Sequence, residues 1–178
     1  MRQRFAILLV CTANICRSPL AELLLTARLD QRRFEVASAG VLGWENHPMD
    51  VPVKEQARRL GVDPDHFLSR RIVSDHLSVA DLVLTATRQH RASVLELDPS
   101  ALRRTFTLRE FAELARQTPG SDLPALVREV STRRSSAPKD IDIPDPYRGG
   151  EPMHREAADL IDDATRTIAD RIGDLNRP

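Results

Sequence analysis

The sequence has few cysteines and no net charge. Its two cysteines in 178 residues both lie near the start, too few for a disulfide framework, and this fits a reducing compartment. Lys and Arg together number 26, as do Asp and Glu, so no charge excess points to nucleic acid as a partner. These absences argue against a disulfide-stapled secreted scaffold and against a nucleic-acid-binding protein.

Long hydrophobic runs are absent as well. The opening MRQRFAILLVC has a basic start and an apolar run, as a secretory or lipoprotein signal has. However, Phe5–Val10 is shorter than the apolar region of such a signal, and Val10 stands where a small residue precedes a lipidated cysteine. No other run approaches the length of a membrane span. We therefore expect a cytoplasmic protein with no membrane insertion.

The remaining composition is that of a globular protein, with 41% hydrophobic and 29% charged residues. The length suits one domain with a full core, which we expect to span residues 1–178. Short apolar runs predict strands at Phe5–Val10, Phe34–Ala39, Ala80–Ala86 and Arg104–Phe106. Helical spacing predicts helices from Pro19 onward and at Val51–Leu60, Thr87–Leu97, Thr107–Leu114, Asp122–Val130 and Arg155–Leu175. This alternation predicts an α/β fold, a central four-stranded parallel sheet with helices on both faces.

Two segments in the C-terminal part have the composition of loops. Ser131–Asp140 is polar and basic, and we expect it to be solvated rather than to bind a ligand. Ile141–Met153, with the sequence IDIPDPYRGGEPM, is rich in turn residues and predicts an irregular connection.

The stretch Cys11–Ser18 follows the first expected strand and leads into a helix. Ligands of parallel sheets bind at the carboxyl ends of strands, and a helix N-terminus there directs N–H groups and a positive dipole at an anion. Arg17 adds a guanidinium fork suited to phosphate, and Asn14 tolerates the left-handed backbone of a tight loop. We therefore predict a loop that binds a tetrahedral oxyanion. It lacks the glycines and lysine of a nucleotide-binding phosphate loop.

Cys11 stands at the mouth of this loop. The positive field favours its thiolate, which is the nucleophilic form, and the Ser18 hydroxyl can donate a hydrogen bond to it. A buried cysteine after a strand is more often an inert core residue, and C-x5-R-S alone is a weak pattern. The strand before Cys11, the helix after it and Pro19 at the start of that helix favour the nucleophile.

The stretch VCTANICRSPLAE, Val10–Glu22, closely resembles the signature of the low-molecular-weight protein-tyrosine phosphatases, V-C-x-G-N-x-C-R-S-P-x-A-E. Ala13 replaces the usual glycine. Three later segments also resemble the family in the same order, so the resemblance covers nearly the whole chain: SAG at Ser38–Gly40, ADLVLTA at Ala80–Ala86 and DPYRGG at Asp145–Gly150. The region Ala115–Asp140 is longer than the usual connection of the family.

The resemblance implies hydrolysis of phosphotyrosine in two steps, without metal or cofactor. Cys11 would form a cysteinyl-phosphate, Arg17 would hold phosphate oxygens, and Asp145 would act as general acid and then as general base. The phosphate-binding residues that it implies are Thr12, Ala13, Asn14, Ile15, Cys16, Arg17 and Ser18. Without the family, Asp145 in IPDPY reads only as a turn residue. The residues themselves predict no metal site, because no His, Cys and Asp cluster with ligand spacing is present.

The family also implies a substrate pocket. Trp44 and Tyr147, the only Trp and the only Tyr, lie in the loops that the family places beside the pocket mouth, where a substrate ring can stack. Either residue could instead simply pack its own loop. Ile15 matches the apolar residue of tyrosine-type members, whereas members acting on phosphoarginine carry Thr there, so Ile15 favours phosphotyrosine.

Other residues near these motifs receive weaker interpretations. Arg148 stands where many members have a second aromatic; it could recognise acidic residues beside the phosphotyrosine, but we expect a solvated loop residue. We assign no supporting role to His66. We expect structural or surface roles for the other four histidines, His47, His76, His90 and His154. Oxidation could join Cys11 to Cys16 and shield the nucleophile, and Tyr147 could be phosphorylated.

Two other functions stay open at this point. An arsenate reductase on the same fold would need a cysteine beyond Cys16 or an external thiol. A non-catalytic phosphopeptide-binding module would need neither Cys11 nor Asp145. We expect a phosphatase that acts on a phosphotyrosine-containing protein, with a tyrosine kinase as a candidate partner.

Overall fold

Four parallel strands form one sheet in the computed structural model, which describes residues 4–139 and 141–175. The strands are β1 (Phe5–Cys11), β2 (Phe34–Gly40), β3 (Leu82–Thr85) and β4 (Thr105–Thr107), in the spatial order β2-β1-β3-β4. β1 pairs with β2 along its whole length, so that Cys11 lies opposite Gly40, and with β3 from Ile7 to Val10. This sheet confirms the predicted α/β fold. The ends of the predicted domain, residues 1–3 and 176–178, lie outside the described residues.

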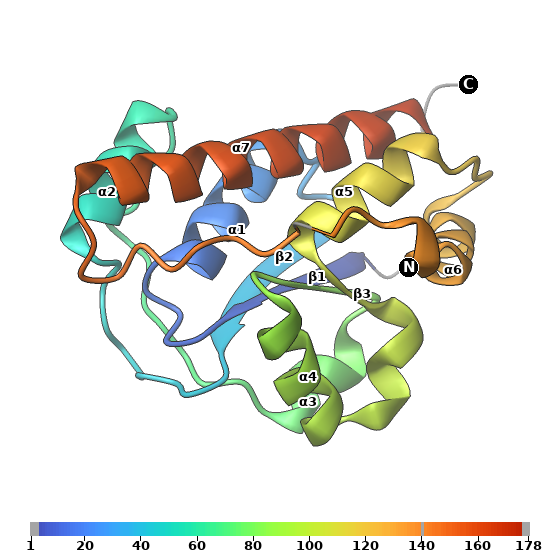
Figure 1. Cartoon of the computed structure of the whole chain (residues 1–178), viewed down its shortest axis with the longest axis horizontal. Coiled ribbons are helices and arrows are strands. Elements are labelled where there is room, and N and C mark those ends of the chain that lie inside the picture. Colours follow the sequence, from blue (N-terminus) through green and yellow to red (C-terminus); the bar gives the residue numbers. More distant parts are fainter. Residues whose placement is uncertain (1–3, 140, 176–178) are drawn as a thin grey trace.

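Helices cover both faces of the sheet, with α1, α5 and α7 on one face and α3 and α4 on the other (Figure 1). The helices are α1 (Arg17–Arg28), α2 (Val51–Arg59), α3 (Ser74–Val79), α4 (Arg88–Leu97), α5 (Leu108–Gln117), α6 (Leu123–Thr132) and α7 (Glu151–Asp174). Two short 3-10 helices complete the chain, η1 (Pro99–Arg104) and η2 (Arg134–Ser136).

β1 lies at the centre of the core because its alternate side chains enter two different clusters. Ile7 and Leu9 pack with buried residues of α1, α5 and α7. Leu8 and Val10 pack on the other face, with buried residues of α3 and α4. A strand buried on both faces needs a continuous apolar run rather than an alternating one, which explains the sequence FAILLV.

The carboxyl end of β1 lies where the strand order reverses. β1 has β2 on one side and β3 on the other, so the chain leaves it toward one edge and later returns to the opposite edge. Parallel sheets bind their ligands at this kind of position. The residues after β1 and the residues after β3 therefore end beside each other, and the fold places any ligand site there.

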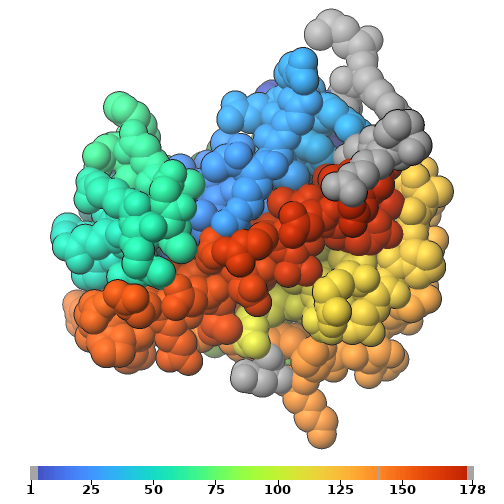
Figure 2. All heavy atoms as spheres, turned by 90° about the horizontal axis from the view of Figure 1, so that it is seen from above, coloured from blue at the N-terminus to red at the C-terminus, as the bar shows by residue number. Residues whose placement is uncertain are grey.

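α7 is the longest helix and crosses one face of the molecule. Figure 2 shows it running between the blue segment of α1 and β2 and the yellow segment of α5. Arg171 of α7 donates to the carbonyls of Ala115 (3.1 Å) and Thr118 (3.0 Å) at the end of α5. Among the residues described, no helix is both long enough and apolar enough to cross a membrane.

The structure adds one helix to the predicted elements and corrects the start of another. α3 was not predicted, because its sequence SDHLSV offers only one buried apolar residue, Leu77, and so lacks a helical period. α7 begins at Glu151, four residues before the predicted start at Arg155. Pro152 occupies its first turn, where the missing N–H of proline costs no hydrogen bond, so the turn-rich segment ends earlier than predicted.

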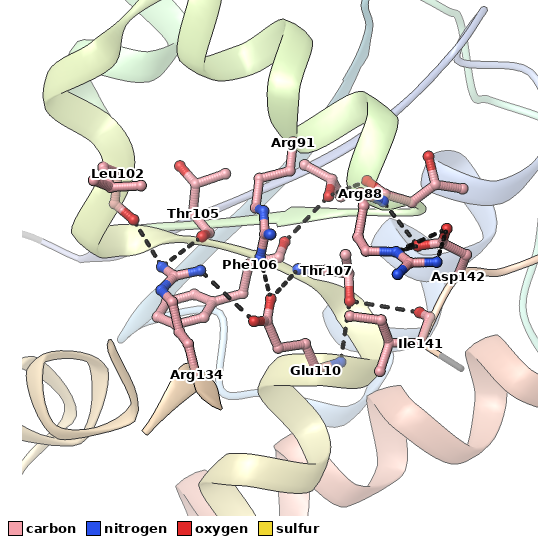
Figure 3. Close-up of polar contacts among 12 residues, drawn as sticks. Arg88, Arg91, Leu102, Thr105, Phe106, Thr107, Glu110, Arg134, Ile141 and Asp142 are labelled. Carbon is pink, nitrogen blue, oxygen red and sulfur yellow. Dashed lines mark hydrogen bonds and ion pairs between the residues drawn. The ribbon is translucent and has the colours of Figure 1, made fainter. Parts of the chain in front are cut away.

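The prediction of a solvated segment at Ser131–Asp140 is wrong for Arg134. Its guanidinium lies 4.0 Å from the centre of the Phe106 ring and donates to the carbonyls of Leu102 (2.7 Å) and Thr105 (2.8 Å) (Figure 3). The planar guanidinium can stack on an aromatic ring while its edge donates hydrogen bonds, so a basic loop residue packs against the core. Asp140, the last residue of that prediction, lies outside the described residues.

Candidate active site

The loop of residues 12–16, which we call the cysteine loop, is held by the strand and loop beside it. The carbonyls of Cys11 and Thr12 accept hydrogen bonds from Val41 N (3.0 Å) and Leu42 N (2.9 Å), and the carbonyl of Ile15 accepts one from Asp50 N (3.0 Å). Within the described residues, no backbone N–H of the cysteine loop donates to a carbonyl. The carbonyls of Thr12 and Ile15 are thus held by neighbouring segments, and the N–H groups of the loop are available to an anion at the start of α1.

Asn14 fixes the shape of this loop. Its backbone is left-handed, with φ of 59°, as the sequence predicted, and its side chain is fully buried. The amide donates to the hydroxyls of Ser18 (2.8 Å) and Ser38 (2.7 Å), and its oxygen accepts from the backbone N–H of Arg70 (2.9 Å). A buried amide with all these partners rigidifies the loop. His66 has no part in these contacts, which agrees with leaving it without a role.

The two cysteines lie in different surroundings. The Cys11 sulfur is buried at the end of β1, 3.0 Å from the Ser18 hydroxyl, which is the contact that the sequence predicted. Cys16 Sγ lies 4.0 Å from a carboxylate oxygen of Asp50. Burial, and secondly the Asp50 charge, raise the pKa of the Cys16 thiol far above its ordinary value, so Cys16 remains a neutral thiol at physiological pH. The two cysteines are both free.

Arg17 connects the cysteine loop to the segment of residues 141–147, which we call the aspartate loop. Its guanidinium donates to the carbonyl of Ile143 (3.0 Å) and to the Thr12 hydroxyl (3.3 Å), and lies 3.1 Å from a carboxylate oxygen of Asp145. Arg17 is buried, and its Nε has no partner within the described part of the chain. An unpaired buried N–H is costly, so this atom is free for an oxygen of a ligand.

These groups line one pocket of about 180 Å³. It brings together Cys11, Arg17 and Asp145, although Asp145 is separated from Arg17 by more than a hundred residues in sequence. The remaining lining residues are Thr12, Ala13, Ile15, Cys16, Leu42, Trp44 and Tyr147. Leu42 was missed by the sequence analysis, because an exposed leucine after a strand carries no signal of its own.

Trp44 and Tyr147 form the rim of this pocket. Their rings lie edge to face with centroids 6.3 Å apart, and both side chains remain partly exposed. Arg148, with φ of 60°, places its guanidinium 5.3 Å from the centre of the Tyr147 ring. Ile15 lies inside the pocket and is buried. The structure therefore places all three predicted pocket residues around one opening that has aromatic walls.

His90, for which the sequence suggested only a structural or surface role, contacts the cysteine loop through a hydrogen bond that spans 78 positions of sequence. Its Nε2 lies 2.8 Å from the Thr12 hydroxyl and its Nδ1 lies 2.9 Å from the Thr87 hydroxyl. Burial, and secondly the Arg17 charge, lower the pKa of His90 to about 4, so its ring is neutral at physiological pH. The sequence offered one indication of this contact: His90 lies in the helix after β3, and the residues after neighbouring parallel strands lie close together.

No group of three His, Cys, Asp or Glu side chains that could hold a metal ion occurs among the described residues. The polar groups of the pocket are instead those that suit an oxyanion: backbone N–H groups, a guanidinium and the dipole of α1. An oxyanion in this pocket would thus be met by fixed donors on the protein.

Comparison with known proteins agrees with this geometry. The sequence model of the low molecular weight phosphotyrosine protein phosphatase family matches residues 6–124. The chain is 28% identical over 167 residues to the low molecular weight protein-tyrosine-phosphatase Etp of Escherichia coli K12, covering 94% of each chain. It is 31% identical over 170 residues to the protein-arginine-phosphatase of Geobacillus stearothermophilus, covering 96% of this chain and 95% of the relative.

Solved structures show the same likeness. The YwlE arginine phosphatase from Geobacillus stearothermophilus superimposes with a TM-score of 0.75 at 30% identity, covering 96% of this chain and 94% of that one. Wzb of Vibrio vulnificus, solved with benzylphosphonate, gives a TM-score of 0.73 at 28% identity, covering 94% and 99%. The family match and these likenesses, together with the cysteine loop, confirm the resemblance found in the sequence: the chain belongs to the low molecular weight phosphotyrosine protein phosphatase family.

Proposed function

We propose that this protein hydrolyses phosphotyrosine in proteins through a cysteinyl-phosphate, with Cys11 as nucleophile, Arg17 as phosphate clamp and Asp145 as general acid and base. The observation that carries the proposal is the convergence of these three side chains on one pocket of about 180 Å³. A site that only bound phosphopeptides would need the clamp, but it would need neither a buried sulfur beside a hydroxyl donor nor a carboxylate across from it.

In the first step the Cys11 thiolate attacks phosphorus, and the bond between phosphorus and the phenolic oxygen breaks. Asp145, in its protonated form, gives its proton to that oxygen. In the second step Asp145 accepts a proton from water, the water oxygen attacks phosphorus, and the sulfur–phosphorus bond breaks to regenerate the thiolate. Proton transfer by a positioned carboxyl group typically accelerates such steps by about 10²–10⁴-fold.

The cysteine loop would stabilise the transferring phosphoryl group. The N–H groups of Thr12–Arg17, with Ala13 and Asn14 among them, would donate to its equatorial oxygens, and Arg17 would donate through Nε and one terminal nitrogen. The contact between Arg17 and Asp145 would open when phosphate occupies the guanidinium, which leaves the carboxyl group free to protonate the leaving oxygen. The Ser18 hydroxyl would stabilise the thiolate of Cys11 in both steps.

Phosphotyrosine is the substrate that the pocket walls favour. A phenyl ring entering over Ile15 would meet Trp44 and Tyr147, which offer aromatic surface rather than hydrogen bonds. Phosphoarginine is the second candidate, because a relative 31% identical to this chain is an arginine phosphatase. Its guanidinium would carry N–H groups that apolar Ile15 leaves without an acceptor, which is unfavourable in a buried pocket.

The proposal extends to the setting of the enzyme. A free buried thiol nucleophile works in a reducing compartment, which supports a cytoplasmic location. The substrate would be a phosphotyrosine-containing protein, and the tyrosine kinase that modifies it would be the partner. An arsenate reductase would need a cysteine to resolve its disulfide, and Cys16, buried and neutral, is poorly suited to that attack.

Phosphate release from a phosphotyrosine peptide and from a phosphoarginine peptide tests the proposal, with Cys11→Ser as control. We expect turnover of the first, little turnover of the second and loss of both in the variant. In Ile15→Thr the preference should move toward phosphoarginine. Equal turnover of both peptides by the wild type would show that Ile15 does not set the specificity, and tight phosphate binding without turnover would support the phosphopeptide-binding module.

A further inference from the structure

The first turn of α4 contacts both loops of the site. His90 reaches the cysteine loop through Thr12, and Arg88 reaches the aspartate loop through Asp142. Both residues lie beyond the pocket lining, so neither touches a bound phosphate directly. Only two residues separate the helix from β3, whose carboxyl end lies beside that of β1. The start of α4 thus contacts both the loop that follows the nucleophile and the loop that carries the acid.

His90 holds the hydroxyl that Arg17 uses. The Thr12 hydroxyl lies between His90 Nε2 (2.8 Å) and the Arg17 guanidinium (3.3 Å). The other ring nitrogen of His90 is fixed by Thr87, the N-cap residue of α4 (2.9 Å). Because both ring nitrogens are engaged and the side chain is buried, the ring has one orientation, and it transmits the position of α4 to Thr12 and Arg17.

Arg88 and Ala86, which lies between β3 and the N-cap residue of α4, hold the aspartate loop. The carboxylate of Asp142 accepts from the backbone N–H of Arg88 (2.8 Å) and from its guanidinium (3.2 Å), as Figure 3 shows. The next residue, Ile143, donates its N–H to the carbonyl of Ala86 (2.9 Å), and its own carbonyl accepts from Arg17. Asp145 follows two residues later, so these contacts determine where its carboxyl group lies.

The start of α4 is itself firmly attached. Arg91 forms an ion pair with the buried carboxylate of Glu110 (2.8 Å), which also accepts from the backbone N–H of Thr107 (3.0 Å) at the start of α5 (Figure 3). Arg134 approaches the same carboxylate at 3.8 Å. Glu110 of α5 thus attaches the first turn of α4 to the rest of the fold, and that turn can therefore serve as a fixed reference for both loops.

We propose that His90 and Arg88, with its partner Asp142, are positioning residues that set the cysteine loop and the aspartate loop at the separation needed for in-line attack and proton transfer. The inference rests on the proposed function. A purely stabilising role accounts poorly for the Arg88–Asp142 pair, because its side chains are 56% and 34% exposed and exposed pairs contribute little to stability. The hydrogen bond from the backbone N–H of Arg88 to the Asp142 carboxylate, next to Ile143, favours a role in loop placement.

Two variants of His90 test the first contact. In His90→Asn the shorter side chain can still reach Thr87 but not Thr12, whereas in His90→Gln the amide can reach Thr12. We expect His90→Asn to weaken the binding of inorganic phosphate about 3–10-fold, as one hydrogen bond predicts, and His90→Gln to restore it. In a Thr12→Val background His90→Asn should have no further effect, which separates positioning from general loosening of the fold. An unchanged affinity, or a loss that persists in that background, contradicts the role of His90.

Leaving-group dependence tests the second contact. Phenolate needs protonation as a leaving group far more than p-nitrophenolate does. Displacement of Asp145 should therefore slow the hydrolysis of phenyl phosphate more than that of p-nitrophenyl phosphate. We expect Asp142→Ala to lower kcat/KM for phenyl phosphate about 10-fold more than for p-nitrophenyl phosphate, and Arg88→Ala to do so less because its N–H remains. Asp65→Ala, which removes an exposed ion pair with Arg58, is the matched control and should leave kcat/KM for both substrates at the wild-type value. Equal loss on both substrates by Asp142→Ala overturns the inference.

A measurement without turnover separates this inference from the proposed function. In Asp142→Ala the amide of Ile143 should exchange its hydrogen faster than in the wild type and in Asp65→Ala. If the wild type hydrolyses neither substrate, the proposed function fails. Faster exchange in Asp142→Ala, together with the expected phosphate affinities of the His90 and Thr12 variants, would still support the placement of the two loops. Unchanged exchange of Ile143 overturns the role of Asp142.

Discussion

Gly40 gives the sharpest prediction about the shape of the cysteine loop. It ends β2 opposite Cys11, and a Cβ atom on it would lie 2.6 Å from the Thr12 carbonyl oxygen, 2.8 Å from the Ala13 carbonyl carbon and 2.8 Å from the Asn14 nitrogen. All three are backbone atoms of the loop, so no flexible side chain can move aside. Gly40→Ala must therefore displace the loop or β2.

β2 cannot yield easily. The N–H of Gly40 donates to the Arg70 carbonyl (2.9 Å), and its carbonyl accepts from Ile72 (2.9 Å), while the residues after it hold Cys11 and Thr12. We therefore expect most of the displacement in the cysteine loop. Overpacking of this kind costs about 1–3 kcal/mol of folding stability. A shift of several tenths of an ångström in the N–H donors should also weaken phosphate binding about 10-fold.

Urea unfolding and titration calorimetry with inorganic phosphate measure the two effects of Gly40→Ala. Gly173→Ala in α7 is the matched control, because a Cβ there meets nothing within 4 Å, and it should stabilise the helix by about 0.5–1 kcal/mol without changing phosphate affinity. The reasoning is refuted if Gly40→Ala unfolds at the wild-type urea concentration and binds phosphate as tightly as the wild type.

Three further predictions concern titration and burial. The pKa of His90 is about 4 in the folded protein, against an ordinary value of 6.5. Its neutral form therefore contributes at most roughly 3 kcal/mol to the free energy of unfolding above pH 6.5, and this contribution is lost as the pH falls toward 4. The free energy of unfolding, measured with urea across this pH range, should decline less for His90→Gln than for the wild type, and an equal decline would contradict the assignment. Iodoacetamide at neutral pH should alkylate Cys11 and spare Cys16, because burial and the Asp50 charge raise the pKa of the Cys16 thiol. Peptide mass spectrometry measures both rates, and equally fast modification of the two cysteines would contradict this prediction. Glu110→Ala should destabilise the fold by about 2–3 kcal/mol because it leaves two guanidinium groups without their buried partner, and a change below about 0.5 kcal/mol in thermal or urea unfolding would rule out that contribution.

Local patterns predicted the elements around Cys11. The run FAILLV needs burial on both faces, and Pro19 suits the first turn of a helix, so the sequence indicates a strand, a loop and a helix without any distant information. The left-handed Asn14 and the contact between Cys11 and Ser18 follow from residue type and from a separation of seven positions.

Long-range contacts set the limit of that prediction. His90 looked like a structural residue because nothing near it in sequence shows that Thr12 lies 2.8 Å away. Arg134 looked solvated because Phe106, on which it stacks, belongs to another element. Asp145 could be interpreted only through the family resemblance, since its partner Arg17 lies at the other end of the chain. In each case the topology of the sheet, and not the local pattern, determines the contact.

The most direct test of the account is to find the covalent intermediate. A phosphotyrosine peptide mixed with the wild-type protein and quenched within one turnover should leave a phosphoryl group on the peptide that contains Cys11, detected by mass spectrometry, and Cys11→Ser should release no phosphate. Turnover by the wild type with no phosphate on Cys11 at any time, or turnover retained in Cys11→Ser, would contradict the assignment of the nucleophile.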